Sequence, residues 1–275
     1  MAGRKSNDDK SVPQGGTILV TSKLFDVTGK VVLVTGGSRG IGAMITRAFV
    51  EAGAKVYVSS RDAQVCDRTA DELSEFGSCH SLPFDLSTLE GIEGLSKALE
   101  AREAQLDVLV NNAGATWGAP IDEYPESGWD KVVDLNMKSV FFLAKRMLPL
   151  LRRAAAAETP ARIINVSSIN GIEPPELETY AYSASKAGCI MLTRHLAARL
   201  ASEHILVNAI APGPFPSKMT AAMLAESGES IRSSVPLRRI GEPEDIAGVS
   251  LFLASRASAY TTGAVIPCDG GMAEL

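Results

Sequence analysis

The stretch "VLVTGGSRGIG", Val32 to Gly42, places four glycines directly after a run of aliphatic residues. The aliphatic run predicts a buried strand, and the glycines predict a tight turn into a helix. Glycines at this GxxxGxG spacing also let the backbone approach a pyrophosphate, which the N-terminus of the helix attracts. The stretch therefore predicts a dinucleotide-binding unit, with an ordinary strand-to-helix turn as the alternative. Its candidate cofactor-binding residues are Gly36, Ser38, Arg39, Gly40, Ile41 and Gly42.

Along the rest of the chain, short runs rich in β-branched residues alternate with amphipathic segments of helical length. This alternation is typical of βαβ units on a parallel sheet. We predict an α/β fold: a Rossmann-type doubly wound parallel sheet of about seven strands with helices on both faces. One domain over residues 23–275 would follow a flexible extension over residues 1–22. The expected strands cover residues 31–36, 55–60, 80–86, 106–114, 161–168, 205–213 and 263–271, and long helices are expected over 129–153 and 182–203.

The composition limits the classes of function. A chain of 275 residues with a formal net charge of -5 has no concentrated basic block of the kind that binds nucleic acid. No apolar run approaches the ~20 residues that cross a bilayer, and the N-terminus lacks the apolar core of a secretory signal. The four cysteines and three histidines lack metal-ligand spacing. We therefore expect a cytoplasmic protein with reduced cysteines and with no metal, nucleic-acid partner or membrane contact.

The end of the second expected strand, "SSRD", bears on the choice of dinucleotide. An NAD-binding unit carries an acid about twenty residues after its glycines to hold the ribose 2′-hydroxyl. Here the strand ends at Ser60 and Arg61, and Arg39 lies in the glycine loop, so two guanidinium groups would flank a 2′-phosphate. NADP(H) is therefore the predicted cofactor. The alternatives are that both arginines are ordinary surface residues, or that Asp62 reaches the ribose.

A tyrosine and a lysine in "YAYSASKAG" have a spacing that suits proton transfer. Tyr182 and Lys186 are four residues apart and share one face of a helix, where the ammonium group stabilises a phenolate. Upstream, Ser168 ends an expected strand at the carboxyl edge of the sheet, where its hydroxyl can bind a carbonyl oxygen that gains negative charge. We predict these three residues as catalytic. The alternative is a Tyr–Lys pair on a helix surface without a chemical role.

The motifs "TGGSRGIG", "NNAG", "LNMKSVF" and "APG", together with the Ser–Tyr–Lys set, resemble the short-chain dehydrogenase/reductase family in their order from about Leu24 to Gly271. Stretches such as "NNAGATWGAP" and "IAPGPFPSKMT" look most like the rhamnolipid-pathway type of NADPH-dependent 3-oxoacyl reductase within that family. The resemblance implies reduction of a ketone, with a 3-oxoacyl thioester as the expected substrate. An oxidative secondary-alcohol, sugar or steroid dehydrogenase and a non-catalytic dinucleotide-binding sensor are the alternatives.

The resemblance also implies roles for matching positions. Asn136 would hold a water that relays protons to Lys186, and Ser168 rather than Ser167 would orient the carbonyl group. Ser217 stands where the family often has Thr and would contact the nicotinamide carboxamide. The other residues implied to contact the cofactor are Asp85, Leu86, Asn112, Ala113, Gly114, Tyr182, Lys186, Pro212 and Gly213.

Clues to the substrate and to assembly are fewer. Relatives that dock an acidic carrier protein have basic residues near the site entrance; Arg152 and Arg153 match one such position, but Glu203 replaces another. This mismatch disfavours delivery of the substrate by a carrier protein. A coenzyme A thioester and a free ketone are the alternatives. Apolar stripes on the two long helices, and the resemblance, imply a homotetramer or homodimer. The residues expected to cover the nicotinamide, or alternatively to pack a lid helix, are Trp117, Ile169, Phe215, Met219 and Met223.

Overall fold

Seven parallel strands form a single sheet in the order β3-β2-β1-β4-β5-β6-β7 in the computed structural model, which describes residues 21–217 and 220–273. The chain builds outward from β1 in one direction and then, from β4, in the other, as in a doubly wound sheet. This arrangement confirms the predicted fold class. The strands are β1 (Val31–Thr35), β2 (Lys55–Ser59), β3 (Cys79–Ser81), β4 (Val108–Asn111), β5 (Ala161–Val166), β6 (Ile205–Pro212) and β7 (Val265–Cys268).

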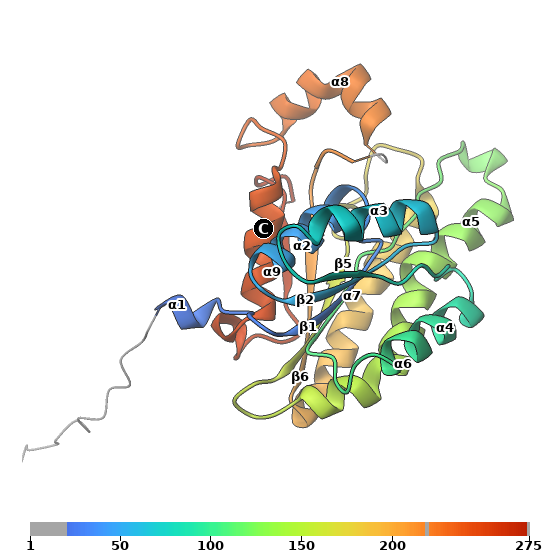
Figure 1. Cartoon of the computed structure of the whole chain (residues 1–275). Coiled ribbons are helices and arrows are strands. Elements are labelled where there is room, and N and C mark those ends of the chain that lie inside the picture. The colour runs from blue at the N-terminus through green and yellow to red at the C-terminus, as the bar shows by residue number, and fades with distance from the viewer. Residues whose placement is uncertain (1–20, 218–219, 274–275) are drawn as a thin grey trace, which may run out of the picture.

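Helices cover both faces of the sheet, as Figure 1 shows. Successive residues of β1 alternate between the two cores: Val32 and Val34 belong to one cluster and Leu33 to the other. All five residues of β1 are therefore buried, which explains their continuous apolar run. The first cluster includes residues of α2 (Gly40–Glu51), α3 (Ala63–Leu73) and α9 (Pro243–Ala254), and the second includes residues of α4 (Leu89–Glu100), α6 (Ser139–Ala154) and α7 (Tyr180–Leu200).

Further helical segments lie before, between and after these helices in the chain. The helix α8 lies beyond the carboxyl ends of the strands, away from the two layers (Figure 1). The segments are α1 (Thr21–Leu24), η1 (Ile121–Glu123), α5 (Glu126–Val133), η2 (Asp134–Lys138), η3 (Ile169–Gly171), η4 (Ala201–Glu203), α8 (Ala221–Ser234) and η5 (Arg256–Ser258).

The long helix expected over residues 129–153 is interrupted. A π-helical turn, η2, separates α5 from α6. Such a turn adds one residue to the helical repeat and rotates the side chains that follow it, and it is frequent at functional sites. It contains Asn136, which is only 1% exposed.

No helix in the described ranges is long and apolar enough to cross a membrane. Within the same ranges, no group of three or more His, Cys, Asp or Glu side chains is placed to hold a metal ion. Residues 1–20 lie outside the description, so the predicted extension over residues 1–22 and its boundary with the domain stay predictions.

A buried arginine ties the amino end of β5 to the end of α9. The side chain of Arg162 donates hydrogen bonds to the carbonyl oxygens of Pro160, Leu253 and Ser255, at 2.7, 3.1 and 3.0 Å. Burial lowers the pKa of its guanidinium to about 10, so the group remains charged at neutral pH. A cation at this position also suits the negative end of the helix dipole.

We expect Arg162→Met to lower the free energy of unfolding by about 2 to 4 kcal/mol, because it removes charge-assisted bonds to buried carbonyl groups. Urea unfolding measures the change. Arg194, which is exposed on α7, supplies the control: Arg194→Met should change the same quantity by less than about 0.5 kcal/mol. Equal effects of the two substitutions would show that the buried bonds add nothing.

Candidate active site

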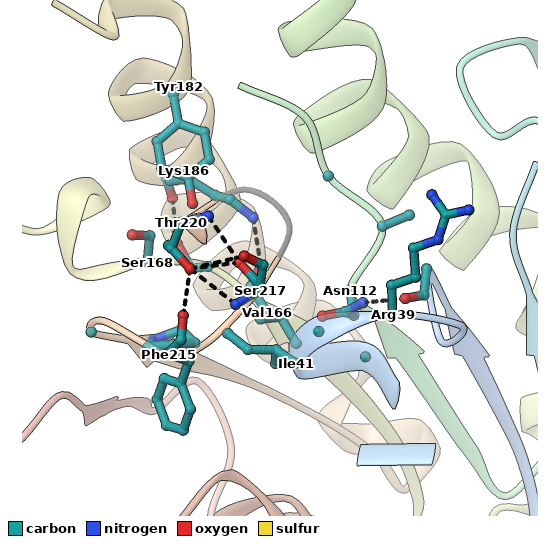
Figure 2. Close-up of a pocket in the computed structure, with 18 residues that line it drawn as sticks. Arg39, Ile41, Asn112, Val166, Ser168, Tyr182, Lys186, Phe215, Ser217 and Thr220 are labelled. Atoms are coloured by element: carbon teal, nitrogen blue, oxygen red, sulfur yellow. Dashed lines mark hydrogen bonds between the residues drawn. The ribbon is translucent and has the colours of Figure 1, made fainter. Parts of the chain in front are cut away.

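A cleft opens at the carboxyl ends of β1, β4, β5 and β6, where parallel sheets of this topology bind ligands. It brings together residues from the glycine loop, from the segment after β4, from α7 and from the loop between β6 and α8 (Figure 2). Its lining residues are Gly36, Arg39, Gly40, Ile41, Gly42, Asn112, Ala113, Gly114, Val166, Ser167, Ser168, Tyr182, Lys186, Pro212, Gly213, Phe215, Ser217 and Thr220.

The glycine loop leaves no space for larger side chains, and at Gly36 and Gly42 the obstacle is backbone. Gly36 has a φ of 61°, and a Cβ atom there would lie 2.8 Å from the Cα atom of Ala113. A Cβ atom on Gly42 would lie 2.1 Å from the carbonyl oxygen of Gly36. The loop leads into α2, whose first backbone N–H groups have no intrahelical partners. This compact backbone at a helix N-terminus fits a pyrophosphate.

Asn112 fastens the glycine loop to β4. Its side-chain amide donates to the carbonyl oxygens of Thr35 and Gly36, at 2.9 and 3.1 Å. The Thr35 hydroxyl accepts the backbone N–H groups of Asn112 and Ala113, at 3.0 and 3.1 Å. These bonds hold the ends of β1 and β4 together beside the cleft.

Arg39 forms an ion pair that crosses from the glycine loop to the end of β2. Its Nη2 atom lies 2.9 Å from Oδ2 of Asp62. The other carboxylate oxygen of Asp62 accepts the N–H of Val65 at 3.2 Å and so caps α3. Both carboxylate oxygens of Asp62 therefore have partners within the chain. The neighbouring residue, Arg61, is exposed.

Tyr182 and Lys186 project from the first two turns of α7 into the cleft (Figure 2). The Lys186 ammonium nitrogen lies 5.7 Å from the centre of the Tyr182 ring and donates to the carbonyl oxygen of Val166 at 2.8 Å. Lys186 is only 5% exposed, so this bond fixes its ammonium group in a buried position. The structure thus places the ammonium group beside the phenol ring, and the part of both groups in proton transfer stays a prediction.

The two serines after β5 have different partners. The Ser167 hydroxyl donates to the backbone carbonyl of Lys186 at 2.9 Å, and this bond uses its proton. The Ser168 hydroxyl accepts the N–H of Asn170 at 3.1 Å, which leaves its own proton available to donate. The geometry therefore favours Ser168 as the donor to a carbonyl oxygen in the cleft.

Asn136 does not line the cleft but supports it from behind. Its side-chain oxygen accepts the N–H of Ala115 at 2.8 Å, and its amide donates to the Ala115 carbonyl and to the Ser185 hydroxyl, at 2.9 and 3.1 Å. A Cβ atom on Gly114 would lie 3.3 Å from the Asn136 oxygen and 3.7 Å from the Lys186 nitrogen. Asn136 thus joins the loop after β4 to α7, and its role in a water relay stays a prediction.

Several residues that support the cleft were not predicted. A chain of buried amides and a hydroxyl runs across the strands: Asn111 donates to Asn165 and Asn165 donates to Thr193 of α7, each at 2.8 Å. Thr220 faces Ser217, and their hydroxyl oxygens lie 2.9 Å apart (Figure 2). Thr220 also donates to the Phe215 carbonyl at 2.7 Å. The Asn111–Asn165–Thr193 chain joins residues that only the fold brings together, so no short motif indicates it. The Ser217–Thr220 pair is local, three residues apart, and could have been found from this spacing.

Some predicted contacts lie outside the lining of the cleft. The Leu86 side chain is 5% exposed and packs in the core against residues of α4, and Oδ1 of Asp85 accepts from the N–H and hydroxyl of Ser87. Any contact of Leu86 with a cofactor would therefore come from its backbone. The predicted residues that are not part of the lining are Ser38, Ser60, Arg61, Asp85, Leu86 and Asn136.

Among the residues expected to cover the nicotinamide, Phe215 forms a wall of the cleft and is 2% exposed. Trp117 packs against Gly128 and under Lys131, whose nitrogen lies 4.9 Å from the indole ring. Met219 lies outside the described residues, as does the side chain of Met223.

The expectation that Arg152 and Arg153 lie near the entrance is wrong for this chain's own cleft. Both are in the last turn of α6, which runs antiparallel to the strands and ends at their amino edge, opposite the cleft. Arg152 is also paired with Glu203, with Nε 2.6 Å from Oε2.

Comparisons with known proteins find relatives that match most of the chain. The family model described as "Enoyl-(Acyl carrier protein) reductase" matches residues 35–273. The chain is 50% identical over 249 residues to the rhamnolipids biosynthesis 3-oxoacyl-[acyl-carrier-protein] reductase of Pseudomonas aeruginosa, covering 90% of this chain and 97% of that protein. It is 36% identical to a 3-oxoacyl-[acyl-carrier-protein] reductase of Thermotoga maritima, over 89% of this chain and 98% of the relative.

Solved structures of similar proteins superpose on most of the chain. The Pseudomonas aeruginosa RhlG/NADP active-site complex superposes with a TM-score of 0.89 and 49% identity, over 92% of this chain and 99% of the other. A putative NAD(P)-dependent gluconate 5-dehydrogenase from Beutenbergia cavernae, with bound NADP, superposes with a TM-score of 0.84 and 34% identity, over 90% and 98% of the two chains.

Proposed function

The chain belongs to the short-chain dehydrogenase/reductase family, and on that premise we propose that it is an NADPH-dependent reductase of a ketone, with a 3-oxoacyl thioester as substrate and the 3-hydroxy compound as product. The relatives named as 3-oxoacyl-[acyl-carrier-protein] reductases support this substrate class. The observation that carries the proposal is the placement of Tyr182, Lys186 and Ser168 around one end of the cleft.

The glycine loop and the N-terminus of α2 would hold the pyrophosphate of NADP(H), and Arg39 with Arg61 would hold its 2′-phosphate. Ser217, whose hydroxyl is held by Thr220, would contact the carboxamide of the nicotinamide. When bound, NADPH supplies the hydride that adds to the carbonyl carbon.

The residues of the chain then handle the oxygen and the proton. The Ser168 hydroxyl donates a hydrogen bond to the carbonyl oxygen and stabilises the charge that develops there. The Tyr182 hydroxyl gives its proton to the same oxygen, so that the ketone becomes an alcohol. The Lys186 ammonium, fixed by the Val166 carbonyl, stabilises the phenolate that remains. Asn136 binds the hydroxyl of Ser185, the residue before Lys186, and so joins α7 to the loop after β4.

An oxidative dehydrogenase of a sugar or a secondary alcohol is a second candidate, and the likeness to a putative gluconate 5-dehydrogenase favours it. Both candidates use the same residues, because the transfer of hydride and proton is reversible. The discriminating experiment follows NADPH oxidation and NADP⁺ reduction over a panel of 3-oxoacyl thioesters, simple ketones, sugar acids and secondary alcohols. A higher kcat/KM for 3-oxoacyl thioesters supports the proposal, whereas a higher value for NADP⁺-dependent oxidation of a sugar acid contradicts it.

We expect the chain to assemble as a dimer or tetramer in the cytoplasm. Most apolar residues of α6 and α7 are core, but Phe141 and Met191 are 40% and 61% exposed on the outer faces of these helices. Pairing of copies across a two-fold axis would bury both. Light scattering at micromolar concentration should give two or four times the 29.0 kDa mass of the chain. A stable monomer would show that these residues have no partner surface.

A further inference from the structure

The segment between β6 and α8 brings two hydroxyl groups to the cleft. Ser217 and Thr220 both line it, and their hydroxyl oxygens lie 2.9 Å apart (Figure 2). The segment also rests directly on the glycine loop, since a Cβ atom on Gly40 would lie 2.9 Å from the Cβ atom of Ser217. The Ser217 hydroxyl is therefore held where this segment meets the loop that we expect to bind the cofactor.

The hydrogen-bonding capacity of the Thr220 hydroxyl is fully used within the chain. A hydroxyl group has one proton to donate and two lone pairs that accept. The carbonyl oxygen of Phe215 lies 2.7 Å away and can only accept, so it takes the proton of Thr220. The carbonyl oxygen of Ser217, at 3.3 Å, is a second acceptor for the same proton. The backbone N–H of Ser217 donates to one lone pair of Thr220 at 3.0 Å, which leaves the other lone pair for the Ser217 hydroxyl.

These bonds fix the direction of the hydrogen bond between the two hydroxyl groups. Because the Thr220 proton is used on a carbonyl oxygen, the 2.9 Å bond must be donated by Ser217. The Ser217 hydroxyl oxygen in turn accepts the backbone N–H of Thr220 at 3.2 Å. No other group in the described part of the chain bonds this oxygen, so one of its lone pairs remains. Ser217 can accept a hydrogen bond from a ligand, but it can donate one only by giving up its bond to Thr220.

We propose that Thr220 is a positioning residue that makes the Ser217 hydroxyl an acceptor, so that the cleft selects a pyridine ring whose substituent donates a hydrogen bond. This inference rests on the proposed contact between Ser217 and the nicotinamide of NADP(H). A carboxamide has both N–H donors and a carbonyl acceptor, so its nitrogen would face Ser217. A substituent without an N–H group leaves the lone pair of Ser217 unpaired, and a site built around a hydrogen bond binds the analogue that lacks it more weakly.

The first measurement compares three oxidised dinucleotides by titration calorimetry. NADP⁺ and its thionicotinamide analogue have an NH₂ group on the substituent, whereas the 3-acetylpyridine analogue of NADP⁺ has a methyl group in its place. We expect the acetylpyridine analogue to bind about fivefold more weakly than NADP⁺, and the thionicotinamide analogue to bind within about twofold of it, as the loss and the retention of one hydrogen bond imply. Equal dissociation constants for NADP⁺ and the acetylpyridine analogue would overturn the inference.

Two substitutions separate the part of Thr220 from that of Ser217. Thr220→Val keeps the shape of the side chain and removes the acceptor of the Ser217 proton, so Ser217 becomes free to donate to the acetyl oxygen. The dissociation constant of the acetylpyridine analogue divided by that of NADP⁺ should then fall from about five to about one. Ser217→Ala should give the same ratio by weakening NADP⁺ alone. Thr220→Ala removes the same hydroxyl group and takes the place of Thr220→Val if the valine variant does not fold.

A purely structural role of Thr220 predicts a different pattern. Loosening of the segment would weaken all three dinucleotides equally and leave the ratio unchanged, and this result would contradict the inference. Thr220→Ser keeps the hydroxyl group and should restore the wild-type ratio. Thr262, which precedes β7 at the amino edge of the sheet, also accepts a backbone N–H, from Val207 at 3.1 Å. Thr262→Val is therefore the matched control, and it should leave every dissociation constant within about twofold of the wild-type value.

The inference and the proposed function can fail separately. If all three dinucleotides bind equally well to the wild type, Ser217 does not select by accepting an N–H group, but NADP(H) remains the cofactor of a ketone reductase. If none of the three binds, the cleft is not a dinucleotide site and both proposals are wrong.

Discussion

We expect the Tyr182→Phe enzyme to bind NADPH as the wild type does and to turn over about a thousandfold more slowly, since a positioned general acid contributes roughly 10² to 10⁴. The substitution removes one oxygen atom from a half-buried side chain and leaves the ring beside Lys186. The Lys186 ammonium keeps its bond to the Val166 carbonyl, so the cleft should retain its shape. Initial rates measure kcat, and NADPH fluorescence measures the dissociation constant.

A second tyrosine on the same helix is the matched control. Tyr180 lies two residues earlier, is 38% exposed and bonds to Glu178 outside the cleft. Tyr180→Phe should leave kcat within about threefold of the wild type. If Tyr182→Phe kept a near-normal kcat, or if both variants lost activity equally, the proton donor would be another group.

Motifs confined to a few neighbouring residues were predictable from the sequence. The glycine loop needs only its own spacing and the strand before it, and Tyr182 with Lys186 needs only one turn of helix. Each lies where the sequence placed it, and each lines the cleft. The strand positions were predictable for a similar reason, since a strand buried on both faces has a continuous apolar run.

Partners that are distant in the sequence could not be predicted in this way. Asn111 and Asn165 are 54 positions apart, and Arg162 and Leu253 are 91 apart. Each of these side chains resembles an ordinary polar residue in a strand until neighbouring strands and helices are placed beside it. The π-helical turn at Asn136 was missed because the letters "DLNMK" contain neither Gly nor Pro, the usual signals of an interruption.

The ion pair between Arg39 and Asp62 also joins residues that are distant in the sequence. It bears on the choice of cofactor. Each arginine beside the 2′-phosphate should favour NADPH over NADH by about tenfold after screening by solvent, and the two together by roughly a hundredfold. We therefore expect Arg61→Ala to raise KM for NADPH about tenfold and to leave KM for NADH unchanged. Arg39→Ala should act in the same direction, and both effects should shrink as salt rises.

Asp62 decides between the two interpretations of the "SSRD" stretch. Its carboxylate caps α3 and binds Arg39, so it competes with a phosphate for that guanidinium. Asp62→Asn keeps a good N-cap residue and removes the competing charge, so the preference for NADPH should increase a few-fold. Arg256, exposed at the opposite edge of the sheet, supplies a control for net charge, and Arg256→Ala should change neither KM. If Asp62→Asn instead weakened NADH alone, or if Arg61→Ala weakened both cofactors equally, Asp62 would be the ligand of the ribose hydroxyls and the arginines would be surface residues.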